Sequence, residues 1–165
     1  MDQRTMAMNL YEELMDLCDL FDRENLWDKR GSEIALSLLL RTDLALFMLY
    51  LSVADETLSE SEAEVFRFVT AFPRSRQDQM DLYRGNRIID SCGSTIPYSL
   101  TKIVEAQRTA FARGVQLPGE KTAQEIFADL CDVSGRMMLG ADGDITPEET
   151  RMLEDYICML RQYHP

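Results

Sequence analysis

The chain has 165 residues and a mass of 19.0 kDa, with 45% hydrophobic and 28% charged residues. This length suits one domain with an ordinary core, and the composition excludes collagen-like and low-complexity classes. The formal net charge of −12 argues against nonspecific nucleic-acid binding, because phosphates would repel the chain as a whole. We therefore predict a single domain over residues 1–165 that binds a basic protein partner or a cation and no nucleic acid.

The acidic residues gather in the two ends of the chain. Residues 1–72 carry 6 basic and 15 acidic side chains, residues 73–119 carry 7 and 4, and residues 120–165 carry 4 and 10. The seven basic residues of the middle are dispersed and form no stripe. A cation or a basic partner is accordingly expected at the acidic ends.

The cysteines and the N-terminal residues indicate the cellular compartment of the protein. Three of the four cysteines, Cys18, Cys131 and Cys158, lie among apolar residues of helical segments, and Cys92 does not. None of the four belongs to a Cys-x-x-Cys motif, so we predict reduced thiols in the core. No signal peptide is evident at the N-terminus. Both features favour a cytoplasmic protein.

Only residues 34–54 are apolar enough to raise the question of a membrane helix. Arg41 and Asp43 lie at the centre of this stretch, where each would cost about 2.5 to 3.5 kcal/mol in a bilayer. A buried helix is therefore preferred and no membrane association is expected.

Apolar residues at helical spacing define the first half of the chain. The first amphipathic helix ends before Gly31, and its apolar face carries Leu10, Leu14, Leu17 and Phe21. Ser32 is expected to cap a long central helix that runs to about Ala54. A third helix begins after Ser59 and ends before Pro73.

The second half continues the helical pattern after an irregular connection. A short helix is predicted around residues 76–83, followed by an irregular segment to residue 98. The next helix runs from Pro97 to a left-handed stop at Gly114, with Phe111 on its apolar face. The last two helices span Thr122 to Ala141 and Thr146 to Tyr163, so we predict an all-α fold.

An internal repeat relates two parts of the chain. A shift of 87 residues places VADETLSESEAEVF (53–66) over GADGDITPEETRML (140–153). The apolar residues of the helices before these segments also match. The repeat predicts two pseudo-symmetric helix-loop-helix units in a helical bundle, over about 33–72 and 120–163.

Each copy of the repeat contains a capping box. In Ser59-Glu-Ser-Glu62 and Thr146-Pro-Glu-Glu149 the hydroxyl accepts a backbone N–H and the glutamate reaches back to the N-cap N–H. A proline at the first helical position, as in the second copy, needs no donor there. Caps of this kind stabilise by about 1 kcal/mol and explain these residues without a ligand.

The aspartates before the boxes are less easily explained. Asp55 and Asp142 lie where a long helix ends, and a carboxylate at that pole of the helix dipole costs about 0.3 to 1 kcal/mol. An Asx turn over Gly143, a neighbouring arginine or a bound divalent cation would offset the cost.

A calcium EF-hand is excluded, since Pro147 and Leu153 stand where glycine and glutamate are needed. Two loops brought together, with help from Asp43 or Asp132, would supply enough oxygens. The structural interpretation is favoured over the metal site.

The two loops resemble those of the TerB-like family, helical proteins associated with tellurite resistance and stress response. The matching segments are Ala-Asp-Gly-Asp-Ile-Thr-Pro-Glu-Glu at 141–149 and Ala-Asp-Glu-Thr-Leu-Ser-Glu-Ser-Glu at 54–62. The resemblance covers about residues 33–163 and implies an all-α fold with two pseudo-symmetric halves. It also implies an acidic cluster that binds a divalent cation (Ca, Mg or Mn), formed by Asp55, Glu62, Asp142 and Glu149 with Asp144 beside them.

Two features depart from the family pattern. Glu56 replaces the loop glycine in the first copy, which makes a left-handed backbone there more costly and the two sites unequal. The connection through Arg84, Gly85, Asn86 and Cys92 matches nothing in that pattern.

Little in the sequence points to catalysis. The only histidine is His164, beside the C-terminal proline, which disfavours catalytic triads and histidine-ligated zinc. We predict a noncatalytic cytoplasmic TerB-like module that binds a divalent cation or a protein partner through an acidic face, in stress or metal-oxyanion resistance. The alternative is a pure interaction scaffold with structural aspartates, and a metal-dependent carboxylate enzyme is the least favoured reading.

Overall fold

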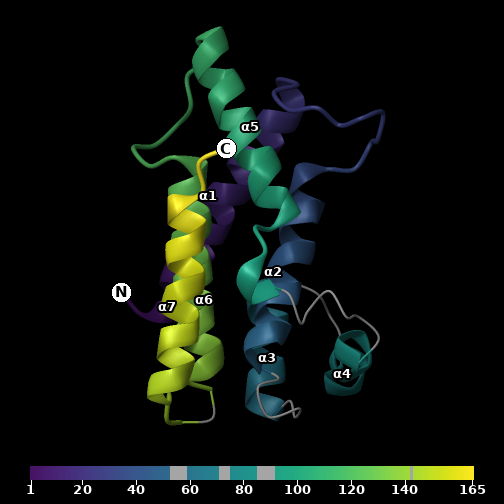
Figure 1. Cartoon of the computed structure of the whole chain (residues 1–165). Coiled ribbons are helices and arrows are strands. Elements are labelled where there is room, and N and C mark those ends of the chain that lie inside the picture. The colour runs from purple at the N-terminus through teal and green to yellow at the C-terminus, as the bar shows by residue number, and fades with distance from the viewer. Residues whose placement is uncertain (53–58, 71–74, 85–91, 142) are drawn as a thin grey trace.

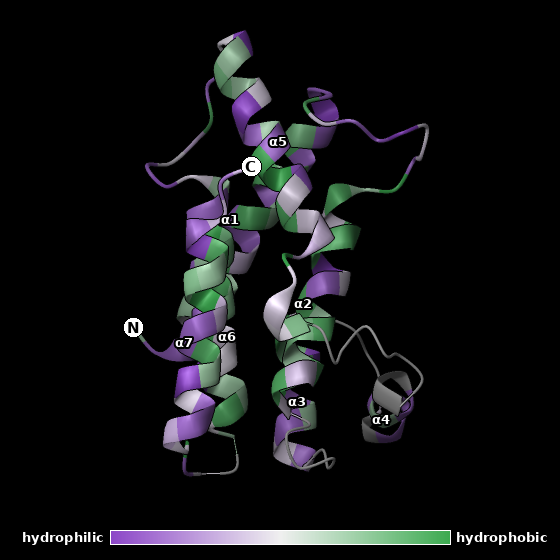
Figure 2. Ribbon diagram, viewed as in Figure 1, coloured by the Kyte–Doolittle hydropathy of each residue, from purple (hydrophilic) through white to green (hydrophobic). Residues whose placement is uncertain are grey.

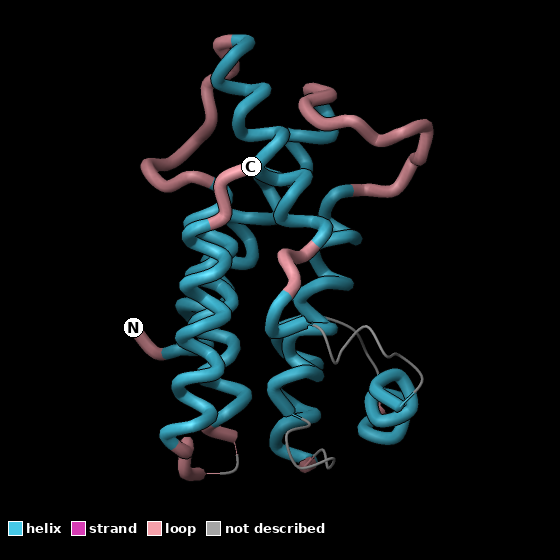
Figure 3. Tube along the Cα trace, in the orientation of Figure 1, coloured by secondary structure: helices cyan, strands magenta, loops and turns pink. Residues whose placement is uncertain are grey.

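The chain folds into a bundle of helices (Figure 1). The computed structural model describes residues 1–52, 59–70, 75–84, 92–141 and 143–165. Within these residues there are seven α-helices and no strand (Figure 3), which confirms the predicted all-α class. The helices are α1 (Gln3–Arg23), α2 (Leu36–Ser52), α3 (Glu60–Thr70), α4 (Arg76–Arg84), α5 (Tyr98–Arg113), α6 (Ala123–Leu139) and α7 (Pro147–Gln162).

Two helices form the centre of the bundle. Helix α6 packs against α1, α2, α3, α5 and α7, and α2 packs against α1, α3, α5 and α6. Their inward faces are apolar, as the hydropathy colouring in Figure 2 shows. Four phenylalanines are almost fully buried in this core: Phe21, Phe47, Phe66 and Phe127. Burial of such side chains contributes about 1.5 to 3 kcal/mol each, which makes this core the main source of stability.

Helix α2 confirms the prediction of a buried helix in the apolar stretch. Nine of its 17 residues are buried, and they lie on several sides of the helix because four other helices cover it. Among the described helices, none is long and apolar enough to cross a bilayer.

Helix α1 ends earlier than predicted, and Ser32 does not cap α2. The first helix stops at Arg23, and residues 24–35 form a connection in which Asn25 and Arg30 adopt φ of 53° and 50°. The Ser32 hydroxyl accepts the N–H of Ile34 at 3.1 Å, which is a local turn outside any helix. The predicted cap was wrong because Ser32 makes this shorter-range bond and α2 starts four residues later.

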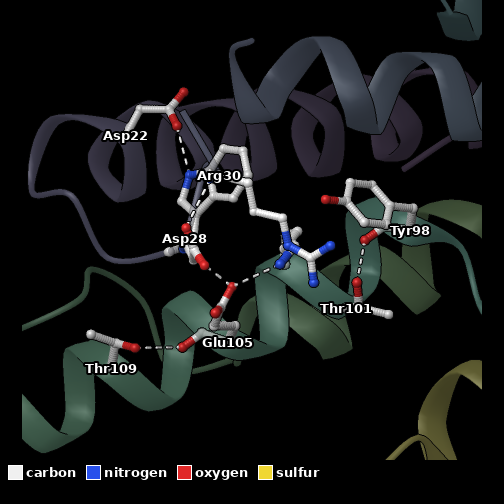
Figure 4. Close-up of polar contacts among 9 residues, drawn as sticks. Asp22, Asp28, Arg30, Tyr98, Thr101, Glu105 and Thr109 are labelled. Atoms are coloured by element: carbon white, nitrogen blue, oxygen red, sulfur yellow. Dashed lines mark hydrogen bonds and ion pairs between the residues drawn. The ribbon is translucent and has the colours of Figure 1, made fainter. Parts of the chain in front are cut away.

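The carboxylate of Asp22 provides the missing cap from a distance. Its Oδ2 accepts the N–H of Leu36 at 3.0 Å, and its Oδ1 accepts the indole N–H of Trp27 at 2.8 Å. Lys29 adds an ion pair at 3.2 Å to the same Oδ1. Figure 4 shows Asp22 above this connection and Glu105 below it. One side chain at the end of α1 therefore fixes both the connection and the start of α2.

Glu105 of α5 holds the other side of the same connection. Its Oε2 accepts the N–H of Asp28 at 3.4 Å and pairs with the ammonium of Lys102 at the same distance. The α1–α2 connection is therefore attached to both α1 and α5 (Figure 4).

Helix α5 begins and ends close to the predicted residues. Gly114 follows it with φ 70°, which confirms the left-handed stop. Phe111, however, is 90% exposed, so its prediction as part of an apolar face was wrong. The last turn of α5 projects towards the top of Figure 1, and Phe111 lies on its uncovered side, whereas its neighbour Ala110 is buried.

The cysteines follow the core prediction only in part. Cys18 and Cys131 are buried and Cys92 is half-buried, but Cys158 is exposed on α7. None of the four forms a disulfide. Cys158 was wrongly predicted as a core thiol because α7 is covered on one side only, by α6 and by Phe47 of α2.

Candidate functional site

The helices that follow the two repeated loops begin with the predicted capping boxes. At α3, the Ser59 hydroxyl accepts the Glu62 N–H at 3.1 Å, and a Glu62 carboxylate oxygen accepts the Ser59 N–H at 3.2 Å. At α7, Thr146 and Glu149 make the same pair of bonds at 3.2 and 3.3 Å. Both caps are thus confirmed, and Pro147 occupies the first position of α7.

The two helix starts lie at the same end of the bundle. In Figure 1, α3 and α7 both begin at the bottom, away from the projecting end of α5. Both α2 and α3 contact α6, which joins the two helical hairpins. The arrangement brings the two capping boxes, with Glu62 and Glu149, to one end of the molecule.

The predicted metal ligands are placed unequally. Asp55 and Asp142 lie outside the described residues. Glu62 is 6% exposed and Glu149 is half-buried, and each uses a carboxylate oxygen in its own cap. Asp144 is exposed to solvent.

The two auxiliary carboxylates are engaged elsewhere. Asp132 makes an ion pair with Arg136 at 3.0 Å, one turn further along α6. Asp43 Oδ2 accepts the N–H of Ser99 at 2.7 Å and thereby caps the start of α5, for which Pro97 provides no side-chain cap. Burial raises the pKa of the Asp43 carboxyl above its ordinary value, and the nearby Ser99 hydroxyl and N–H act in the opposite direction.

The described carboxylates, thiols and imidazole do not by themselves assemble a metal centre. Within the described ranges, no group of three or more histidine, cysteine, aspartate or glutamate side chains is placed to hold a metal ion. Calcium takes about six to eight oxygen ligands and magnesium about six. The cation site predicted from the sequence, with Asp55 and Asp142 among its ligands, therefore stays a prediction.

A pocket of about 310 Å³ lies between α2, the segment before α5, and α7. Its wall is mostly apolar and aromatic, with a carboxyl, a thiol and three hydroxyl groups among the lining side chains. The lining residues are Asp43, Leu46, Cys92, Thr95, Ile96, Pro97, Tyr98 and Tyr156. A small apolar pocket with a few polar groups is typical of a ligand site.

Tyr156 is the most buried polar side chain of this pocket. It is 2% exposed, and its ring stacks on Phe47 with centroids 4.5 Å apart. None of the described residues forms a hydrogen bond with its hydroxyl. Burial, together with the acidic groups around it, raises the pKa of Tyr156 well above its ordinary value, so the phenol is neutral.

This pocket was not predicted from the sequence. Asp43 was noted as a charge that argues against a membrane span and as an auxiliary oxygen for the metal site, and not as part of a pocket. The same observation carried a second signal, since a charge within a buried helix needs a partner or a site. The contribution of Tyr156 and Cys92 had no such signal, because it depends on how α7 and the segment before α5 meet α2.

Comparison with known proteins gives no further identification. No known protein family, characterised protein or solved structure matches this chain.

Proposed function

We propose that this chain is a noncatalytic, cytoplasmic TerB-like module that binds a divalent cation through the acidic end of two related helical hairpins. The observation that carries the proposal is the register of the helices. Helices α2 and α6 begin at Leu36 and Ala123, and α3 and α7 begin at Glu60 and Pro147, so both pairs are separated by 87 residues. The second helix of each hairpin also begins with a capping box, which supports a duplicated unit.

The proposal of a bound cation is supported by the net charge and by the common location of the starts of α3 and α7. Both helix starts lie at one end of the bundle, and the chain carries a net charge of −12. In this proposal Asp55 and Asp142 supply the principal oxygens and Asp144 completes the set. Glu62 and Glu149 hold the helix starts in place while their caps remain intact. A role in stress or metal-oxyanion resistance is part of the same proposal.

The second candidate is a protein-interaction scaffold in which these carboxylates are purely structural. The caps favour it, because they already explain one oxygen of Glu62 and one of Glu149. Phe111 favours it as well, since an aromatic side chain that is 90% exposed is more readily explained by a contact with another protein than by the fold.

Thermal unfolding in the presence of calcium, magnesium, manganese or a chelator tests the proposal. A cation at a hundredfold excess over its Kd stabilises the native state by about 2.7 kcal/mol. For a chain of this size that corresponds to an increase in Tm of roughly 5 to 11 °C. The Asp142→Asn variant is expected to lose the increase and keep the Tm of the metal-free protein.

Asp16→Asn is the matched control, because Asp16 is exposed on α1 and has no part in either hairpin. It should retain the full increase in Tm. A Tm that is unchanged by all three metals would contradict cation binding and would favour the protein-interaction scaffold.

A further inference from the structure

We propose that the pocket between α2, residues 92–97 and α7 binds a small organic amine with an apolar body, whose ammonium group pairs with Asp43. This site is separate from the acidic hairpin end, and the proposal does not depend on a bound metal. Three features of the pocket lead to this class of ligand: its shape and lining, its charge, and the unused hydroxyl of Tyr156.

The lining selects a ligand with an apolar body. Leu46, Ile96 and Pro97 provide aliphatic surface, and Tyr98 and Tyr156 provide aromatic surface. At about 310 Å³ the pocket lies near the lower end of the range of about 300–1,000 Å³ for small-molecule sites, which limits the ligand to a small molecule.

The charge of the pocket selects a cation. Asp43 is the only charged side chain among the described lining residues. The start of α5 would otherwise attract an anion, but its Ser99 N–H is already bonded to Asp43 at 2.7 Å. An anionic ligand would therefore meet a carboxylate, whereas an ammonium group would form a charge-assisted hydrogen bond with it.

A metal ion fits the same pocket poorly. Calcium and magnesium need about six or more oxygen ligands, and this wall offers one carboxylate among apolar and aromatic groups. Aromatic rings instead attract organic cations. Lys102 illustrates this at the edge of the site, where its ammonium lies 5.6 Å from the centroid of the Tyr98 ring. The same ammonium is paired with Glu105, which reduces its repulsion of a second cation.

Tyr156 offers a ligand one further polar contact in the pocket. Its hydroxyl is part of a side chain that is 2% exposed, and it makes no hydrogen bond with the described residues. The hydroxyl oxygen is not among the fully enclosed side-chain atoms without a partner, so it is open to the pocket. A hydroxyl or amine on the ligand would satisfy it.

Titration calorimetry with 2-phenylethylamine tests the proposal. Its closest analogues are 3-phenylpropionate, which carries the opposite charge, and 2-phenylethanol, which carries none. We expect the amine to bind the wild type, the alcohol to bind about tenfold more weakly or worse, and the carboxylate not to bind. Equal binding of amine and carboxylate, or no binding of the amine at millimolar concentration, would overturn the proposal.

Two variants locate the binding. Asp43→Asn keeps an oxygen for the Ser99 N–H but removes the charge, so amine affinity should fall about tenfold or more. Thr95→Trp fills the mouth of the pocket from an exposed position and should abolish binding without touching the core. Asp19→Asn, an exposed carboxylate on α1, is the control for nonspecific attraction to an acidic protein and should bind as the wild type does. Amine binding that survives both pocket variants would place the ligand elsewhere and refute the assignment.

Discussion

Replacement of Asp22 by alanine is expected to weaken the fold more than any other single change of an aspartate on α1. The side chain is 19% exposed and joins the end of α1 to Trp27, Lys29 and the start of α2. Its removal leaves two buried donors without an acceptor, the Trp27 indole N–H and the Leu36 N–H. A hydrogen bond to a charged group contributes about 1.5 to 3 kcal/mol, and the two bonds share one carboxylate, so we expect a loss of about 3 kcal/mol.

Urea unfolding measures this loss directly. Trp27 is the only tryptophan of the chain, so its fluorescence follows the connection while far-UV circular dichroism follows the helices. In thermal unfolding, the same loss corresponds to a decrease in Tm of roughly 6 to 12 °C. The Asp22→Asn variant retains one acceptor oxygen and should lose about half as much free energy of unfolding.

Asp19→Ala serves as the matched control, because Asp19 is exposed on the same helix, and it should change the free energy of unfolding by less than about 0.5 kcal/mol. A loss below about 1 kcal/mol for Asp22→Ala, or a loss equal to that of the control, would show that this carboxylate does not hold the connection as described.

Three further predictions concern the caps, the pocket and the projecting end of α5. Ser59→Ala and Thr146→Ala should each lower the free energy of unfolding by about 1 kcal/mol in urea titrations, and equal stability of either variant and the wild type would contradict the caps. Because burial raises the pKa of Asp43, its contribution to stability is present below the ordinary aspartate pKa and is lost as pH rises through the raised value. The free energy of unfolding of Asp43→Asn, relative to that of the wild type, should therefore increase between pH 4 and pH 7. A difference that does not change with pH would show that the pKa of Asp43 is not raised. Phe111→Ser should change the free energy of unfolding by less than about 0.5 kcal/mol, since the ring is 90% exposed, and a larger loss would mean that it packs against the protein.

Local signals in the sequence predicted much of the fold. The boxes at Ser59 and Thr146 and the stop at Gly114 depend on residues within one turn of the helix end, so the sequence was sufficient to locate them. A third capping box opens α6, although only the helix was predicted there. The Thr122 hydroxyl accepts the Glu125 N–H at 3.2 Å, and the Glu125 carboxylate accepts the Thr122 N–H at 2.8 Å.

The errors arose where the structure depends on residues that are far apart in the chain. Ser32 looked like the cap of α2, but the N–H of Leu36 is satisfied by Asp22, fourteen residues earlier in the chain. Phe111 matched the apolar period of α5, but it lies on the uncovered side of the last turn of the helix. Sequence periodicity shows which residues share a helix face and carries no information on how far the neighbouring helices reach.

The candidate sites show the same contrast between local sequence signals and contacts of distant segments. Glu62 and Glu149 were correctly predicted as capping residues from their spacing, whereas the pocket around Asp43 and Tyr156 combines α2 and α7 with a segment that has no regular pattern. The metal-binding assignment of Asp55, Glu62, Asp142, Asp144 and Glu149 remains a prediction.

Paramagnetic broadening by manganese in a ¹H–¹⁵N spectrum tests the central proposal most directly. Mn²⁺ at a small fraction of the protein concentration should broaden the amide signals at the start of α3, near Ser59, and at the start of α7, from Gly143 to Thr146. The amides between Gly114 and Glu120, at the opposite end of the bundle, should stay sharp. Loss of the effect in Asp142→Asn would agree with a cation held by both hairpins. Broadening of only one hairpin, or equal broadening over the whole acidic surface, would contradict it.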